Sequence, residues 1–390
     1  MMKRAILSLL KGDLARSGGM IFLASLSANI ILFFANLFIA DQLGAVDFGV
    51  FKVISYLFTF LPILIDFGAN YTMTKYISEF RSRSSEKIGY MIKWFLKIRI
   101  FSYSLLIAFV LVFNEQLALL FLKDASLGYL VFSGVLMTAM SFFVIFQFIV
   151  LGFHKFKMFA LSQFLTLTSS AVLSILLSPL GIFYTVIGWS FGFLIGNIFN
   201  IKFFFKEDLI KKSKEFDVKR IFKKFSLPSE FVWISINLFS IIIPVLSLFF
   251  SQEAIGYFSF AFLFYFATLL VPTSISSVVF PKVSELNGFN KRRDAKGILK
   301  KALLLYAPVF LIGMMLVALV SDLFFATFFE NYLASLPAFK VMVSLGLLFG
   351  FNMIYINYLQ GLGRVKRFAL MIVLQNVILF TVSFALLSMF

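Results

Sequence analysis

The stretch Gly152-Phe-His-Lys-Phe-Lys-Met-Phe-Ala-Leu161 recurs later in the chain as Gly361-Leu-Gly-Arg-Val-Lys-Arg-Phe-Ala-Leu370. Both copies follow the pattern G-x-x-[KR]-x-K-x-F-A-L, so the chain carries an internal repeat. Two shorter pairs of segments have nearly the same spacing: Phe48–Phe51 with Ile255–Phe258, and Ser27–Asn29 with Ser235–Asn237. Three matches at one spacing predict two halves that share a fold.

Long apolar stretches surround both copies of the repeat. The 390-residue chain is 61% hydrophobic and 14% charged, whereas soluble domains are about a quarter charged. A run of about 20 apolar residues crosses a bilayer as a helix, and a membrane strand would alternate over about 10 residues. Continuous runs therefore predict about eleven transmembrane helices: 20–40, 49–70, 94–113, 127–151, 159–177, 181–201, 227–250, 256–280, 302–320, 336–359 and 368–390.

The repeat aligns the first predicted helix with the seventh, and the fourth and fifth with the tenth and eleventh. Six helices per copy is an even number, so both copies have the same orientation in the membrane. We predict an all-α integral membrane protein with two pseudo-symmetric parallel lobes of six and five helices, a twelfth helix being missing. The expected segments are an amphipathic cytoplasmic N-terminus (1–19), an N-terminal lobe (20–205), a basic cytoplasmic linker (206–226) and a C-terminal lobe (227–390).

Basic residues set the orientation. Of the 35 Lys and Arg residues, all except Lys52, Lys123 and Lys340 fall on one side when the predicted helices alternate in direction. Positive charge marks the cytoplasmic side, which predicts a multi-pass protein of the cytoplasmic membrane with a cytoplasmic N-terminus. The net charge of +17 is then a topology signal, so we expect membrane lipids and no nucleic acid as partners.

Catalytic and metal-binding patterns are missing from the sequence. The chain has no Cys and one His, His154, so it offers no His-based triad, no H-E-x-x-H pair and no Cys cluster. It contains no Walker sequence, and the short external segments hold no obvious carboxylate pair. We expect no enzyme, no catalytic residue, no metal and no cofactor, which favours a transporter.

Polar residues within the predicted helices are the candidate functional positions, because each is costly in lipid unless it faces protein or water. On the second helix, Lys52, Tyr56, Thr59 and Asp66 share one face through their helical spacing. The substrate-binding candidates of the first, second and seventh helices are Lys52, Tyr56, Thr59, Asn29, Asn36 and Asn237. The candidates for an ion-coupling site or gate are Asp66 and Glu230.

Each candidate also has a structural interpretation. Lys52 and Lys340 could extend to the membrane surface, and Asp66 could pair with a neighbouring helix. Glu230 follows Pro228 at the predicted start of a helix, where a carboxylate suits the helix dipole. The Asn and Ser residues could simply hold helices together.

Several motifs resemble those of one family. Leu43–Phe51 resembles the L-G-x-x-x-[FY]-G-x-[FY] signature after the first helix of polysaccharide-export flippases, and Glu253–Phe258 resembles its counterpart after the seventh. Phe280–Glu285 resembles the F-P-x-[LIV]-S-E turn after the eighth helix, and Gly361–Arg364 resembles the turn after the tenth. The chain is thus similar to the oligosaccharide flippases of the multidrug, oligosaccharidyl-lipid and polysaccharide exporter superfamily.

The resemblance implies a two-lobed bundle in which helices 1, 2, 7 and 8 line a cavity. It implies a polyprenyl-diphosphate-linked oligosaccharide as substrate, moved to the outer face by alternating access driven by an H⁺ or Na⁺ gradient, with polysaccharide polymerase machinery as a partner. Lys52 would contact the diphosphate or sugar and Asp66 would couple the ion. Two alternatives stay open: a cation-coupled multidrug exporter of the same superfamily, and a non-transporting enzyme or assembly factor of polysaccharide synthesis.

Overall fold

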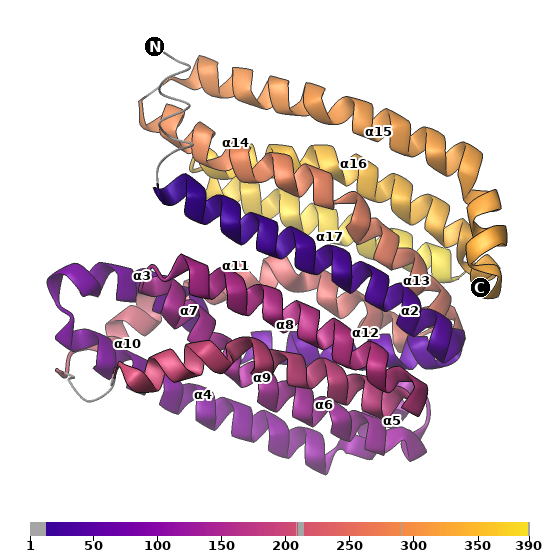
Figure 1. Cartoon of the computed structure of the whole chain (residues 1–390), viewed down its shortest axis with the longest axis horizontal. Helices are drawn as coiled ribbons and strands as arrows, with labels where there is room; N and C mark the ends of the chain where they lie inside the picture. The colour runs from indigo at the N-terminus through magenta and orange to yellow at the C-terminus, as the bar shows by residue number, and fades with distance from the viewer. Residues whose placement is uncertain (1–12, 208, 210–213, 290, 389–390) are drawn as a thin grey trace. The chain divides into compact units, whose positions relative to one another are not determined.

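The computed structural model describes residues 13–207, 209, 214–289 and 291–388. The described residues are helical almost throughout and include no strand, which confirms the all-α prediction. Figure 1 shows the helices with their labels. The first twelve residues of the predicted amphipathic N-terminus lie outside the described part of the chain, and the helix α2 begins at Asp13.

The chain divides into two compact units, 1–42 with 53–234 and 43–52 with 235–390. The helices of the first unit begin with most of α2 (Asp13–Leu64) and continue as α3 (Ala69–Arg83), α4 (Glu86–Val112), α5 (Asn114–Leu122), α6 (Gly128–Ser141), α7 (Ile145–Gly152), α8 (Phe156–Leu177), α9 (Ile182–Lys206), α10 (Val218–Ile221) and most of α11 (Leu227–Asn237). The second unit contains α12 (Ile242–Ser247), α13 (Gln252–Thr268), α14 (Leu270–Gly288), α15 (Arg292–Phe328), α16 (Leu336–Gly361) and α17 (Val365–Leu387).

Ten helical runs among the described residues are long and apolar enough to cross a membrane. The first of them, Gly19–Leu64, contains two of the predicted helices, because α2 continues through a kink at Gly44. Gly44 has φ 71° and ψ 172°, which is not helical. The remaining nine runs match the other nine predicted helices, with shifted ends.

Three predicted helix starts were wrong. α4 begins at Glu86 and not at Trp94, and α15 begins at Arg292 and not at Ala302. The run that contains α11 begins at Val218, inside the segment predicted as a linker, and a π-helical turn, Phe222–Ser226, joins α10 to α11. In each case charged residues form the first turns of a helix whose later turns are apolar, so a hydropathy pattern detects only the later part.

Small residues let helices of the first unit approach closely. Gly188, Gly192 and Gly196 of α9 face α8, where a Cβ on any of them would collide with backbone atoms of α8. Ser170 donates a hydrogen bond across this contact to the Trp189 carbonyl at 2.8 Å, and Ser174 donates to the Thr185 carbonyl at 3.0 Å. This small-x-x-x-small packing is the usual way for helices to associate in lipid.

The main repeat has the same local geometry in both units. At Gly152 of α7 a Cβ would collide with Met73 and Ile77 of α3, and at Gly361 of α16 it would collide with Phe280 and Val283 of α14. Each glycine is followed by a turn with one positive φ, at His154 (59°) and at Gly363 (71°). The repeated sequence therefore builds the same helix end against the equivalent helix in each unit.

The two segments of the second repeat pair, around Gly49 and around Gly256, lie in contact with each other. A Cβ on Gly49 would collide with the Gln252 carbonyl, and a Cβ on Gly256 would collide with the Ala45 carbonyl. Gln252 occupies in its copy the place that Ala45 has in the first, so this contact is locally symmetric. Its closeness gives a physical reason why 43–52 belongs to the second compact unit.

Candidate functional site

The second predicted helix is interrupted near its end. The sequence predicted one helix over 49–70, but α2 ends at Leu64 and α3 begins at Ala69. Between them, Phe67 and Gly68 have positive φ values of 51° and 70°. We call Ile65–Gly68 the α2–α3 break. A break within apolar helices leaves backbone groups that need partners from protein or water.

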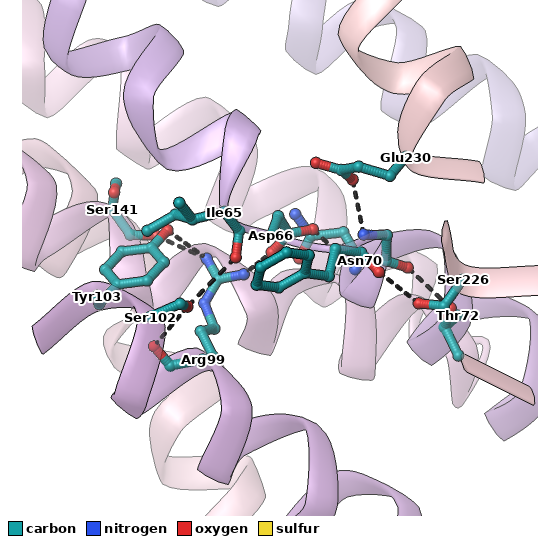
Figure 2. Close-up of polar contacts among 12 residues, drawn as sticks. Ile65, Asp66, Asn70, Thr72, Arg99, Ser102, Tyr103, Ser141, Ser226 and Glu230 are labelled. Atoms are coloured by element: carbon teal, nitrogen blue, oxygen red, sulfur yellow. Dashed lines mark hydrogen bonds and ion pairs between the residues drawn. The ribbon is translucent and has the colours of Figure 1, made fainter. Parts of the chain in front are cut away.

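Side chains from α11, from α4 and from the π-helical turn before α11 supply these partners (Figure 2). Glu230 of α11 accepts a hydrogen bond from the Gly68 amide, with 2.6 Å between N and Oε2. The hydroxyl of Ser226 donates to the Phe67 carbonyl at 2.5 Å, and that of Ser102 of α4 donates to the Ile65 carbonyl at 3.3 Å. The break is thus held by specific polar contacts.

Asp66 lies within the break and forms a buried ion pair with Arg99 of α4. Arg99 also donates from Nη2 to the Tyr103 hydroxyl at 2.9 Å and to the Ser141 carbonyl at 3.3 Å. The other carboxylate oxygen of Asp66 accepts from the Asn70 amide at 3.2 Å. Asp66 and Arg99 are 5% and 3% exposed, and a buried pair needs such additional hydrogen bonds to offset its desolvation.

Three charged groups meet here, and their charges do not balance. Glu230, also 5% exposed, interacts electrostatically with Arg99. Its Oε1 has no hydrogen-bond partner among the described residues. Two carboxylates against one guanidinium leave an excess negative charge in a buried place, which a bound proton or cation would remove.

Two aromatic residues pack on each other near Glu230. The Tyr71 ring of α3 packs edge-to-face on Trp233 of α11, with 5.4 Å between ring centroids. Burial raises the pKa of the Tyr71 hydroxyl, and the Glu230 carboxylate raises it further.

Among the described residues, no group of three His, Cys, Asp or Glu side chains could hold a metal ion.

Glu230 and Asp66, the two coupling candidates, lie at the same break. Glu230 is in the first turn of α11, as predicted, although the helical run that contains α11 starts earlier, at Val218. Its carboxylate also meets the amino end of α3 at Gly68, where a negative charge suits the dipole of that helix.

Lys52 lies in the second unit and is 4% exposed. Its Nζ lies 5.0 Å from the ring centroid of Phe48 and 5.4 Å from that of Phe51. A cation over aromatic faces is stabilised by their quadrupoles. A side chain this buried is not extended toward water, so the alternative of a surface-seeking lysine does not hold for Lys52.

The other substrate-binding candidates lie in varied settings. Thr59 and Asn29 are exposed, Asn36 is buried, and Tyr56 and Asn237 are half-buried. Asn29, Asn36 and Thr59 each donate to the carbonyl four residues earlier in their own helix, at 2.7, 2.7 and 2.6 Å. Their role in binding stays a prediction. Lys340 is the other lysine that could extend to the membrane surface, and it forms an exposed ion pair with Asp322 at 2.8 Å.

Sequence reasoning missed Arg99. It lies near the start of the predicted helix 94–113 and was therefore counted with the cytoplasmic basic residues, but α4 begins at Glu86, which places Arg99 well inside the helix. The available signal was its neighbourhood: Arg99-Ile-Phe-Ser-Tyr103 leads directly into an apolar run, and a basic residue there needs a partner.

Replacing Gly68 with Ala should destabilise the protein, because an L-residue is strained at φ 70° and its Cβ would collide with the Ser226 backbone. We expect a loss of about 1–3 kcal/mol in the free energy of unfolding, measured in mixed detergent micelles. Gly19→Ala is the matched control, since a Cβ at Gly19 meets nothing within 4 Å. Equal stability of the two variants would contradict the account of the break.

Comparison with known proteins gives the family. A family model described as polysaccharide biosynthesis protein matches residues 14–287. The chain belongs to this family. The match covers most of the chain and confirms the resemblance drawn from the sequence motifs. A search of curated proteins by sequence gives no match to this chain.

Solved structures extend the comparison to the fold. An inward-facing multidrug-resistance MATE-family transporter of the MOP superfamily aligns with a TM-score of 0.69 at 14% identity, covering 94% of this chain and 97% of that one. The lipid II flippase MurJ in an inward closed conformation aligns with a TM-score of 0.65 at 17% identity, covering 94% and 86%. This member of the polysaccharide biosynthesis family therefore has the fold of MOP-superfamily transporters.

Proposed function

We propose that this protein is a flippase, which moves a polyprenyl-diphosphate-linked oligosaccharide from the cytoplasmic to the outer face of the cytoplasmic membrane. The observation that carries the proposal is a polysaccharide biosynthesis family match on a chain that shares its fold with a lipid II flippase. A lipid-linked sugar is the cargo that fits both findings, the polysaccharide biosynthesis family and the fold of a lipid II flippase.

The buried cluster at the α2–α3 break supports ion coupling within this proposal. Asp66 is paired with Arg99, whereas Glu230 has an oxygen without a partner among the described residues. We assign the exchangeable H⁺ or Na⁺ to Glu230, and we assign to the Asp66–Arg99 pair the task of holding the break in place. Binding of the cation would remove the excess charge and change the stability of the contact between α11 and the break.

A cation-coupled drug exporter is the second candidate, favoured by the fold match to MATE-family transporters. Lys52 discriminates between the two. A buried lysine repels cationic drugs, whereas it attracts a diphosphate or an acidic sugar. The proposal therefore favours an anionic cargo over a cationic drug.

Deleting the gene tests the function in cells. A membrane-impermeant reagent that labels the glycan should find the lipid-linked unit shielded in the deletion strain and accessible in the parent. Normal labelling of the outer face in the deletion strain would contradict the proposal, provided that the lipid-linked unit is still made and no second copy of the activity is present.

Lys52→Ala should lower transport of the lipid-linked sugar at least about tenfold, because loss of a buried charged contact costs about 2–5 kcal/mol. The protein should remain in the membrane in normal amount. Lys340→Ala is the matched control, since Lys340 is exposed and paired with Asp322. Equal transport by the Lys52 and Lys340 variants would remove Lys52 from the substrate site.

A further inference from the structure

Helix α15 contains the most apolar membrane-length stretch among the described residues. Its most apolar 18-residue window has the highest mean hydropathy of the ten membrane-length runs, and only 6% of that window is buried. Within the second unit it packs along α14 and α16 (Figure 1). Most of its surface is therefore available to membrane lipid, which makes any groove on it a candidate lipid site.

A groove of about 590 Å³ lies at the basic end of this helix. Its wall consists of one face of α15 together with Phe351 of α16, and it is almost wholly apolar. The α15 residues that line it recur at helical spacing, as expected for a single face: Arg293, Lys296, Gly297, Leu299, Lys300, Leu303, Leu304 and Ala307.

The lining changes character along the helix axis. Arg293, Lys296 and Lys300 occupy the first turns, and their side chains are exposed. Only apolar residues follow, from Leu303 to Ala307. Long basic side chains line apolar surface with their stems and place their charges at its edge. The result is a positively charged rim at one end of an apolar groove.

The rim carries a net positive charge of its own. The segment Lys291–Lys301 contains six basic residues and a single carboxylate, Asp294. Among the described residues, no ion pair involves Arg293, Lys296 or Lys300. The charge pattern predicts that this end of α15 faces the cytoplasm, where the leaflet surface is negative and attracts basic residues by about 1 kcal/mol each.

We propose that this groove is a binding site for an anionic phospholipid of the cytoplasmic leaflet. The phosphate would lie among Arg293, Lys296 and Lys300, and one acyl chain would lie against Leu303, Ala307 and Phe351. Basic pockets between membrane helices bind anionic lipid head groups in this way. The site is separate from the α2–α3 break and does not depend on the proposed transport activity.

Lipid binding to the purified full-length protein tests the proposal, for example by native mass spectrometry. The probes are dioleoyl phosphatidylglycerol, dioleoyl phosphatidylcholine and glycerol 3-phosphate. We expect the first to bind about tenfold or more tightly than the second, and the third not to bind, because it lacks the chain. Equal binding of the two phospholipids, or binding of glycerol 3-phosphate as tight as that of phosphatidylglycerol, would overturn the proposal.

Two sets of variants locate the site. A triple variant should reduce the preference for phosphatidylglycerol over phosphatidylcholine to within about twofold. It combines Arg293→Gln, Lys296→Gln and Lys300→Gln. The control removes the same charge elsewhere, with Lys219→Gln, Lys223→Gln and Lys224→Gln, all at exposed residues. Equal loss of preference in both triple variants would show a general charge effect and overturn the assigned site.

Gly297 provides a test that leaves the helix intact. A Cβ there meets nothing within 4 Å, so a side chain can start at this position without a collision of its Cβ. Gly297→Glu places a carboxylate among the three basic residues and should weaken phosphatidylglycerol binding at least about fivefold relative to Gly297→Gln. Identical binding by these two variants would overturn the proposal, as would displacement of phosphatidylglycerol by equimolar polyprenyl phosphate, which would assign the groove to the substrate lipid.

Discussion

Replacing Arg99 with Ala lowers the free energy of unfolding by about 3–5 kcal/mol, the largest stability loss that we expect from a single substitution at the break. The change leaves the Asp66 carboxylate buried without its cation. It also removes the donor to the Tyr103 hydroxyl and to the Ser141 carbonyl. Unfolding by a denaturing detergent in mixed micelles measures the loss.

Two comparisons separate the ion pair from a general effect of removing charge. Adding Asp66→Asn to the Arg99→Ala variant should restore part of the stability, because the uncompensated carboxylate is then gone. Lys340→Ala breaks an exposed pair and should cost no more than about 1 kcal/mol. If the double variant were less stable than Arg99→Ala alone, the pairing would not explain the loss.

Replacing Glu230 with Gln is expected to have the largest effect on transport. The amide oxygen of Gln can still accept the hydrogen bond from the Gly68 amide, so the break keeps its contact. The side chain can no longer exchange a proton or bind a cation by charge, so one state of the proposed cycle is favoured permanently. We expect gradient-driven transport to fall at least about tenfold, since a shift of 1.4 kcal/mol already gives that factor.

Proteoliposomes with an imposed H⁺ or Na⁺ gradient measure this effect. Glu253→Gln is the control, because Glu253 is an exposed carboxylate in the first turn of α13. The folded yield of both variants should match that of the parent protein. If the Glu230→Gln variant transports at the same gradient-driven rate as the Glu253→Gln variant, Glu230 does not take part in coupling. Asp66 would then be the remaining coupling candidate.

Apolar runs predicted the helices, because lipid imposes the same requirement on every crossing. Gly44, where α2 kinks, lies in the segment 41–48 that separates the first two predicted helices, so the apolar pattern does change there. The pattern did not predict the break at Phe67 and Gly68, because the predicted helix 49–70 runs through both residues.

The repeat was the more informative signal, because it encodes packing and not only burial. Gly152 and Gly361 are kept small where equivalent helices meet, and His154 and Gly363 adopt the same backbone conformation. A pattern of G-x-x-[KR] reports such a helix end directly. It could not report Arg99, whose partner Asp66 lies 33 residues away in the chain and meets it only through the fold.

The candidate site was accordingly predicted only in part. Asp66 and Glu230 were selected because carboxylates in apolar helices are costly, and that reasoning does not require knowledge of their partners. The contacts of Glu230 with Gly68 and of Ser226 with Phe67 depend on a break that the sequence does not show. Which residues pair across helices depends on the tertiary structure. A single sequence therefore identifies the charged residues in apolar helices but not the residues that neutralise them.

The most direct test of the central claim is transport by the purified protein. The protein is reconstituted into liposomes with a fluorescent polyprenyl-diphosphate-linked oligosaccharide, and a membrane-impermeant quencher reports which leaflet holds the sugar. The account predicts that an H⁺ or Na⁺ gradient changes the protected fraction faster than in protein-free liposomes. A rate equal to that of protein-free liposomes under both gradients, with folded protein present in the membrane, would contradict it.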